Sequence, residues 1–127
     1  MKYLLDTHTI LWFFDHVEKL PETVFKAILD PENRKYVSIV SAWELAIKIS
    51  LGKLAFEGGV SEFFNMIDEN GFELLAVKDE HIKQVEALPF LHRDPFDRML
   101  VASAVSERMS LITADDNIQR YNVEWVW

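Results

Sequence analysis

Short apolar segments alternate with longer amphipathic segments along the chain. The short segments are rich in aliphatic, β-branched and aromatic residues, a pattern typical of buried strands. They predict strands at residues 2–6, 36–40, 72–77, 110–113 and 123–127. The longer segments repeat apolar residues at helical spacing and predict helices at 7–14, 21–30, 41–52, 60–71, 78–88, 95–109 and 116–121.

Several of these helices have recognisable first residues. Thr9 is the expected N-cap of the first helix, and Ser41 opens the helix after the second strand. Pro95 suits the first position of a helix, where no backbone hydrogen bond needs its missing amide hydrogen. Buried strands that alternate with helices predict a three-layer α/β/α sandwich with a short, mainly parallel central sheet. The 127 residues contain no linker or repeat, so one domain over residues 1–127 is expected.

Composition narrows the function classes. Half of the residues are hydrophobic, which excludes a disordered chain, and the absence of cysteine excludes disulfides and zinc–thiolate sites. An acid at the sixth residue and the lack of any apolar run near 18 residues argue against a signal peptide and a membrane span. A cytoplasmic protein is therefore expected. Proteins that bind nucleic acid by broad electrostatic attraction are usually basic, so the net charge of −8 argues against this class. An acidic protein can still act on phosphates if its acids hold a divalent metal.

Acidic residues recur where predicted strands give way to helices. The carboxyl ends of parallel strands share one edge of a sheet, so these acids are expected to converge in one crevice. Carboxylates that converge repel one another unless a cation joins them, and Mg²⁺ or Mn²⁺ prefers such oxygen ligands. The acids are Asp6, Glu44, Asp94, Asp97, Asp115 and Asp116.

Helix capping offers another explanation for most of these acids. Glu44 stands three residues after Ser41, which fits a capping box, and Asp94 and Asp115 each precede a predicted helix. Asp6 is the exception, because it ends an apolar strand and Thr9 is the better cap. Capping also does not explain why four separate junctions each supply an acid.

Four sequence blocks resemble those of PIN-domain proteins, in particular the VapC-type ribonuclease toxins of bacterial toxin–antitoxin pairs. The blocks are LLDTHTILW, VSIVSAWELAIK, HRDPFDRMLVASA and LITADD, and they occur in the same order between Leu4 and Asp116. The resemblance implies an α/β/α sandwich and cleavage of RNA that depends on Mg²⁺ or Mn²⁺. It also implies a homodimer and neutralisation by a cognate antitoxin protein encoded beside the toxin.

The resemblance also implies specific site residues. The acidic quartet of the family falls on Asp6, Glu44, Asp97 and Asp115; Asp116 is an alternative to Asp115, and Asp94 is a helix cap first and a further ligand second. Water activated by the bound metal would attack phosphorus in line and leave a 5′-phosphate and a 3′-hydroxyl. Candidate RNA contacts are Thr7, Arg93, Arg98 and Thr113, although hydroxyls beside turns are often local caps and arginines beside acids often form ion pairs.

Other side chains have ordinary explanations. Lys48 is a further candidate contact for the RNA backbone, but a solvated position or an ion pair with a neighbouring acid is favoured for it. His8 and His92 are expected to face solvent or a partner. The aromatic segments 10–14 and 123–127 are expected to pack in the core, with a partner surface as the alternative.

Three alternative functions are weighed. A receiver-type phosphoacceptor domain should have paired acids after the first strand and a late lysine, whereas this chain has one acid there and no lysine after Lys83. A DxDxT phosphatase loop is broken by His8. A catalytically silent PIN-like binding module would be expected to lack some of the four acids, all of which are present.

Overall fold

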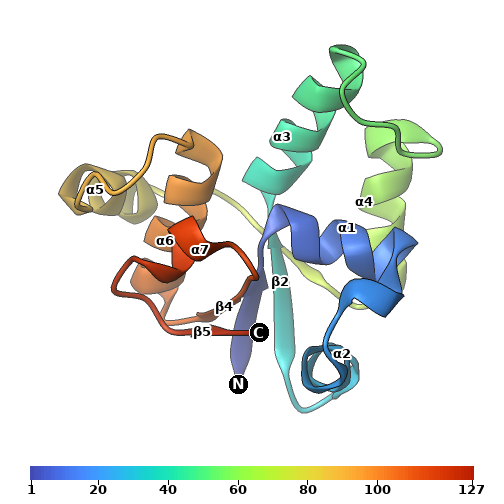
Figure 1. Cartoon of the computed structure of the whole chain (residues 1–127), viewed down its shortest axis with the longest axis horizontal. Coiled ribbons are helices and arrows are strands. Elements are labelled where there is room, and N and C mark those ends of the chain that lie inside the picture. Colours follow the sequence, from blue (N-terminus) through green and yellow to red (C-terminus); the bar gives the residue numbers. More distant parts are fainter.

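The computed structural model describes all residues from 1 to 127 and has one five-stranded sheet (Figure 1). Every strand pair is parallel, and the strand order is β3-β2-β1-β4-β5. The strands are β1 (Lys2–Leu5), β2 (Arg34–Ser38), β3 (Glu73–Leu75), β4 (Ser110–Ile112) and β5 (Trp125–Val126). The predicted parallel α/β fold is confirmed.

Helices cover both faces of the sheet. Figure 1 shows α1, α2 and α4 on one side of the strands and α5, α6 and α7 on the other. The helices are α1 (Thr7–Asp15), the 3-10 helix η1 (Val17–Lys19), α2 (Glu22–Leu29), α3 (Ile39–Ser50), α4 (Gly59–Glu69), α5 (Asp79–Ala87), α6 (Pro95–Glu107) and α7 (Asp116–Gln119). None of them is long and apolar enough to cross a membrane.

Alternation along β1 divides the core into two layers. Tyr3 and Leu5 pack in a cluster with α1, α2 and α4, whereas Leu4 packs in a second cluster with α6 and α7. Successive side chains of a strand point to opposite faces, so a three-residue apolar run serves both layers. The apolar character of β1 thus follows from its central position in a sheet that is covered on both faces.

The N-cap residues of two helices differ from those that the sequence pattern predicts. Asp6, not Thr9, is the N-cap of α1, and its carboxylate accepts a hydrogen bond from the amide of Thr9 at 2.8 Å. Ser38, not Ser41, is the N-cap of α3 and accepts from the amide of Val40. The β-branched residues after Ser38 are typical of a strand, but the Ser38 cap begins a helix at Ile39.

The helix α6 begins as predicted. Pro95 is its first residue, and the carboxylate of Asp94 accepts hydrogen bonds from the amides of Phe96 and Asp97 at 2.9 and 3.1 Å. Asp94 is therefore the helix cap that the sequence indicates. Five successive residues of α6, 100–104, are buried, as expected for a helix in the interior of the fold.

Candidate active site

The carboxylate of Asp6 lies at the carboxyl edge of the sheet and is almost fully buried. Asp6 directly follows β1, and Thr113 directly follows the neighbouring strand β4. The Thr113 hydroxyl donates to Asp6 Oδ2, while the Thr9 amide donates to Oδ1. Burial raises the pKa of Asp6, and the bonds from Thr113 and Thr9 oppose that rise. The fold therefore holds this carboxylate in one orientation despite the cost of its desolvation.

Glu44 is held beside the start of α1. It lies in the second turn of α3, so the capping box with Ser41 that its spacing suggests is not formed. Glu44 Oε1 accepts from the Thr7 hydroxyl at 2.8 Å, and the Ser41 hydroxyl lies 2.9 Å from that of Thr7. Lys48 Nζ lies 2.7 Å from Glu44 Oε2, which is the expected ion pair. The Lys48 side chain is 38% exposed, whereas that of Glu44 is 5% exposed, so only the lysine reaches solvent at the rim of the site.

Asp97 lies in the first turn of α6 and carries the clearest sign of charge crowding. Burial, followed by the negative charges of Asp94, Asp115 and Glu44, raises its pKa to about 7. A hydrogen bond with His92, 3.2 Å from Nε2 to Oδ2, opposes part of this rise. Three acids from different parts of the chain are thus close enough to Asp97 to disfavour its charge.

The two acids after β4 occupy different positions. Asp115 caps α7 by accepting from the Asn117 amide at 2.8 Å, and it lines a cavity of about 200 Å³ together with Asp6 and His8. Its own amide donates to the Thr113 hydroxyl. Asp116 is the exposed first residue of α7 and does not line this cavity. Asp115 is therefore the one of the pair that shares space with Asp6.

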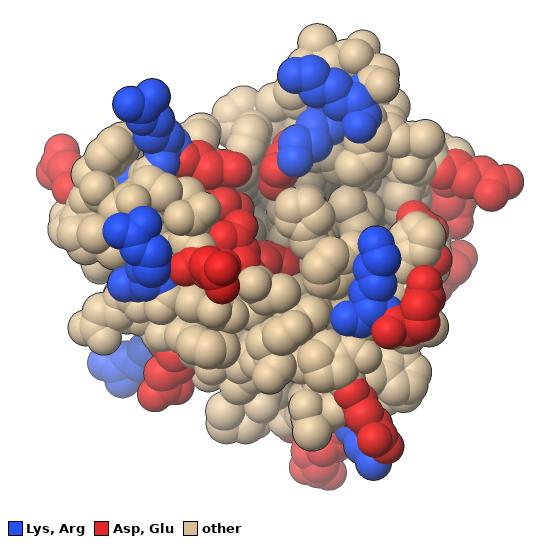
Figure 2. Space-filling model, in the orientation of Figure 1, with Lys and Arg blue, Asp and Glu red and all other residues tan.

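The acids line a hollow in the surface. Figure 2 shows acidic side chains along a central depression between α3 and the α6–α7 side, with basic side chains on the surrounding surface. Carboxylate oxygens are the donors that Mg²⁺ and Mn²⁺ prefer, so the donor set fits such ions. No three acidic or histidine side chains lie close enough together to hold one ion. Binding of one ion by three of them would require side-chain movement or bridging water.

Similarity to known proteins identifies the family of the chain. The model of the PIN domain matches residues 3–124. The chain belongs to the PIN-domain family. Comparison with curated protein sequences gives no match.

Solved structures share the fold of this PIN domain at low sequence identity. VapBC2 from Rickettsia felis, bound to a DNA fragment from its promoter, has a TM-score of 0.77 at 17% identity and covers 100% of this chain and 99% of its own. DNA-bound VapBC from Salmonella typhimurium scores 0.72 at 19% identity, with coverage of 99% and 97%. VapBC-5 from Mycobacterium tuberculosis scores 0.62 at 20% identity, with coverage of 98% and 97%.

The candidate RNA contacts differ in accessibility within the PIN domain. Thr7 and Thr113 are buried and their hydroxyls are bonded to Glu44 and Asp6, so they position carboxylates in this structure. Arg98 is also buried; its guanidinium donates to the carbonyl oxygens of Pro89 and Val85. Arg93 alone is exposed. This geometry does not support the expectation that Arg98 faces RNA, because its charge is used inside the protein.

Sequence reasoning missed the role of one histidine. His92 is only 11% exposed in its side chain and contacts both Asp97 and the Tyr121 hydroxyl, whereas the expectation was a histidine facing solvent or a partner. His8 is exposed, as expected. The five-residue separation of His92 from Asp97 crosses a loop and a helix start, and no helical or strand period marks it.

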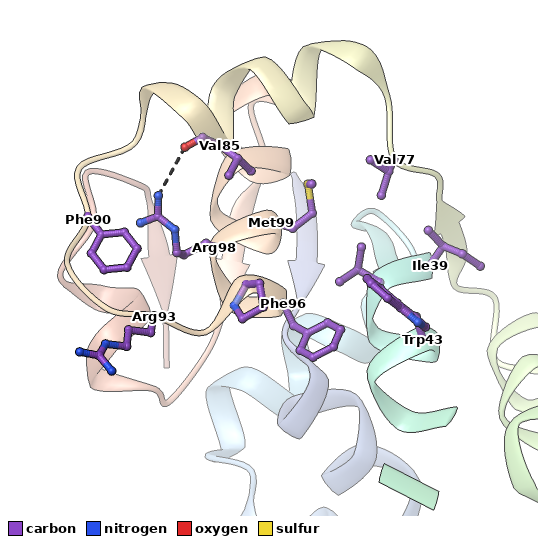
Figure 3. A pocket seen from close by; sticks show the side chains of 11 residues that line it. Ile39, Trp43, Val77, Val85, Phe90, Arg93, Phe96, Arg98 and Met99 are labelled. Atoms are coloured by element: carbon purple, nitrogen blue, oxygen red, sulfur yellow. Dashed lines mark hydrogen bonds between the residues drawn. The ribbon is translucent and has the colours of Figure 1, made fainter. Parts of the chain in front are cut away.

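An apolar cavity lies between α3, α5 and α6, next to the acids in sequence. Its volume is about 640 Å³, and Figure 3 shows Trp43 and Phe96 side by side in its lining. Their ring centroids are 5.2 Å apart in an edge-on arrangement. Trp43 precedes Glu44 and Phe96 precedes Asp97, so this aromatic contact joins α3 and α6 beside two of the proposed ligands.

Proposed function

We propose that the protein is a metal-dependent endoribonuclease and the toxin of a toxin–antitoxin pair. One observation carries the proposal: Asp6 and Asp115 line one cavity at the carboxyl edge of the sheet, and burial, followed by the charges of Asp94, Asp115 and Glu44, raises the pKa of Asp97 to about 7. Such crowding is typical of a site built for cations. Membership of the PIN-domain family gives independent support for nuclease activity.

The proposed ligands are Asp6, Glu44, Asp97 and Asp115, for Mg²⁺ or Mn²⁺. The bound metal would supply Lewis-acid stabilisation of the phosphate and an activated water. The remaining tasks fall to this chain. Thr113 and the Thr9 amide orient Asp6, and Thr7 orients Glu44. Lys48 neutralises Glu44 in the absence of cation and stands at the rim, where an RNA backbone would pass.

The proposed toxin role is supported by the solved structures that share this fold. VapBC-5 from Mycobacterium tuberculosis is a member of the VapBC family of toxin–antitoxin systems, and a solved toxin–antitoxin complex from Klebsiella pneumoniae shares the fold. We infer a cognate antitoxin for this chain, a homodimer and a cytoplasmic setting. The exposed side chains of Trp43 and Phe90, 61% and 72% accessible, offer apolar surface to such partners.

A direct test is cleavage of RNA in the presence of Mg²⁺ or Mn²⁺. Cleavage is expected with either metal, and loss is expected with EDTA and in Asp6→Asn. Asp116→Asn is the matched control, since it removes an equal charge from an exposed position beside the site. Cleavage that survives EDTA and Asp6→Asn would overturn the metal–carboxylate proposal.

A catalytically silent binding module is the second candidate. Its supporting observation is that no three potential ligands lie close enough to hold one ion. Such a module would bind RNA or its partner protein without cleaving RNA under any metal. The receiver alternative is not retained, because a receiver has the strand order 2-1-3-4-5 whereas this sheet runs 3-2-1-4-5.

A further inference from the structure

We propose that His92 is a positioning residue for Asp97, at the end of a hydrogen-bond chain that starts at Arg98 and passes through Tyr121. The inference rests on the proposed function and deepens it, because it gives the hydrogen-bond chain a role in presenting Asp97 to the cation. The four residues come from α6, from the loop before it and from the segment after α7. Each link is a hydrogen bond of the structure.

The links connect a buried cation to a carboxylate in the site. Arg98 Nη1 lies 2.9 Å from the Tyr121 hydroxyl. That hydroxyl lies 2.8 Å from His92 Nδ1, and His92 Nε2 lies 3.2 Å from Asp97 Oδ2. The rings of His92 and Tyr121 also meet edge to face, with centroids 5.4 Å apart. His92 is therefore fixed both by its hydrogen bonds and by its packing.

The direction of the chain follows from its two ends. Arg98 can only donate, so the Tyr121 oxygen accepts from it and uses its single hydrogen elsewhere. Ionised Asp97 can only accept, so His92 Nε2 must carry a hydrogen. A neutral imidazole with hydrogen on Nε2 has an acceptor at Nδ1, which receives the Tyr121 hydrogen. All donors then point toward Asp97, and one tautomer of His92 satisfies every link.

The start of the chain is anchored. Arg98 donates to the carbonyl oxygen of Pro89 at 2.9 Å and to that of Val85 at 3.4 Å, the second of which is drawn in Figure 3. Its guanidinium also lies 4.9 Å from the centre of the Phe90 ring. A buried guanidinium with several acceptors loses little further freedom when it holds Tyr121. The loop before α6 is thus tied to the helix that carries Asp97.

The consequence for the site is an oriented carboxylate. The bond from His92 occupies Asp97 Oδ2, and Oδ1 forms no hydrogen bond with the protein. Side chains that hold a metal ligand from behind are worth about 10- to 100-fold in metal affinity or activity. Loss of the His92 donor is expected to loosen Asp97 and to weaken cation binding in this range.

Three His92 variants of the full chain separate orientation from general packing. In His92→Gln the side-chain amide reaches the place of Nε2 and keeps a donor to Asp97, whereas His92→Asn places its amide near Nδ1 and His92→Ala has none. Mn²⁺ binding measured by calorimetry is expected to fall about tenfold or more in His92→Ala and His92→Asn. His92→Gln is expected to recover most of the affinity. Equal Mn²⁺ affinity in all three variants would overturn the proposal.

The unmodified protein provides a second measurement that does not depend on the folding of a variant. Nitrogen chemical shifts of the His92 ring report its tautomer, and hydrogen on Nε2 is expected above pH of about 8, where Asp97 is ionised. Hydrogen on Nδ1 would break the chain and overturn the proposal. Asp97→Asn separates the two levels of inference: if it leaves Mn²⁺ binding unchanged, the proposed metal site fails, whereas loss of binding there but not in His92→Ala refutes the positioning role alone.

Discussion

Thr113 and Asp6 are 107 positions apart in the chain and share a buried hydrogen bond from hydroxyl to carboxylate. The same hydroxyl oxygen accepts the amide of Asp115 at 3.0 Å. One side chain at the end of β4 therefore fixes two of the proposed ligands at once. The pairing of β1 with β4 delivers this contact, because both strands end at the same edge.

Thr113→Val should separate shape from hydrogen bonding at this position. The variant keeps the volume but removes the donor to Asp6 and the acceptor for the Asp115 amide. A loss of about 1–3 kcal/mol in the free energy of unfolding is expected, as for other buried groups left without a partner. Cleavage of RNA should fall at least tenfold. Chemical denaturation and cleavage rates measure the two effects.

Thr113→Ser is the control for this prediction. It retains the hydroxyl and should keep most of the RNA cleavage. Its free energy of unfolding should fall only because the packing of the deleted methyl group is lost. If Thr113→Val cleaves RNA as fast as Thr113→Ser, the hydroxyl does not orient the site.

The pKa of Asp97, raised to about 7, predicts an unusual pH dependence of stability. Between the ordinary pKa of an aspartate and pH 7, the folded protein binds a proton that the unfolded chain does not bind. Metal-free stability should therefore fall as the pH rises through this window, and the full penalty should be present above pH of about 7. Asp97→Asn removes the charge and should unfold at a higher temperature than the original protein above that pH.

Asp116→Asn is the comparison for the thermal experiment, since Asp116 is exposed and does not line the cavity shared by Asp6 and Asp115. Its melting temperature should show no matching gain at alkaline pH. A gain for Asp97→Asn that is the same at acidic and alkaline pH would contradict the assignment of the penalty to Asp97.

Binding of Mg²⁺ or Mn²⁺ should release protons near neutral pH. A cation beside Asp97 favours the charged carboxylate and so lowers its pKa from about 7. Calorimetry in two buffers with different heats of ionisation gives the number of protons released. Release should decline above pH of about 8, where Asp97 is already ionised, and a constant release across this range would exclude Asp97 as its source.

Lys48→Met should strengthen cation binding. The ammonium of Lys48 lies 2.7 Å from Glu44 Oε2 and competes with a metal for that oxygen. Removal of the competitor should increase Mn²⁺ affinity several-fold, even if RNA binding weakens. Lys26→Met is the matched control, because Lys26 forms an ion pair with Glu22, also four residues away, on the exposed face of α2. Lower Mn²⁺ affinity in Lys48→Met than in Lys26→Met would refute the competition.

Much of this arrangement follows from local sequence pattern. The apolar runs of β1 and β4 are buried on both faces, and such runs followed by an acid indicate the carboxyl edge of a parallel sheet. The start of α3 is harder to predict from sequence, since Ile39 and Val40 suit a strand as well as a helix. Its true start two residues earlier rotates Glu44 away from a cap and toward Thr7.

Other features depend on contacts that no local pattern contains. Arginine is rarely buried, yet Arg98 is buried here because the carbonyl oxygens of Pro89 and Val85 accept hydrogen bonds from its guanidinium. His92 reaches Tyr121 across 29 positions of the chain. Asp6 serves as both cap and proposed ligand, so a choice between the two explanations was too narrow for this residue.

The bond between Thr113 and Asp6 can form only late in the synthesis of the chain. Asp6 leaves the ribosome early, but its partner is added 107 residues later. At about 5–20 residues per second this interval lasts roughly 5 to 20 s. During that interval the central strand β1 lacks one of its two neighbours and the acidic edge is incomplete. A growing chain therefore carries no assembled cleft, and any nuclease activity begins only after β4 has been made and paired.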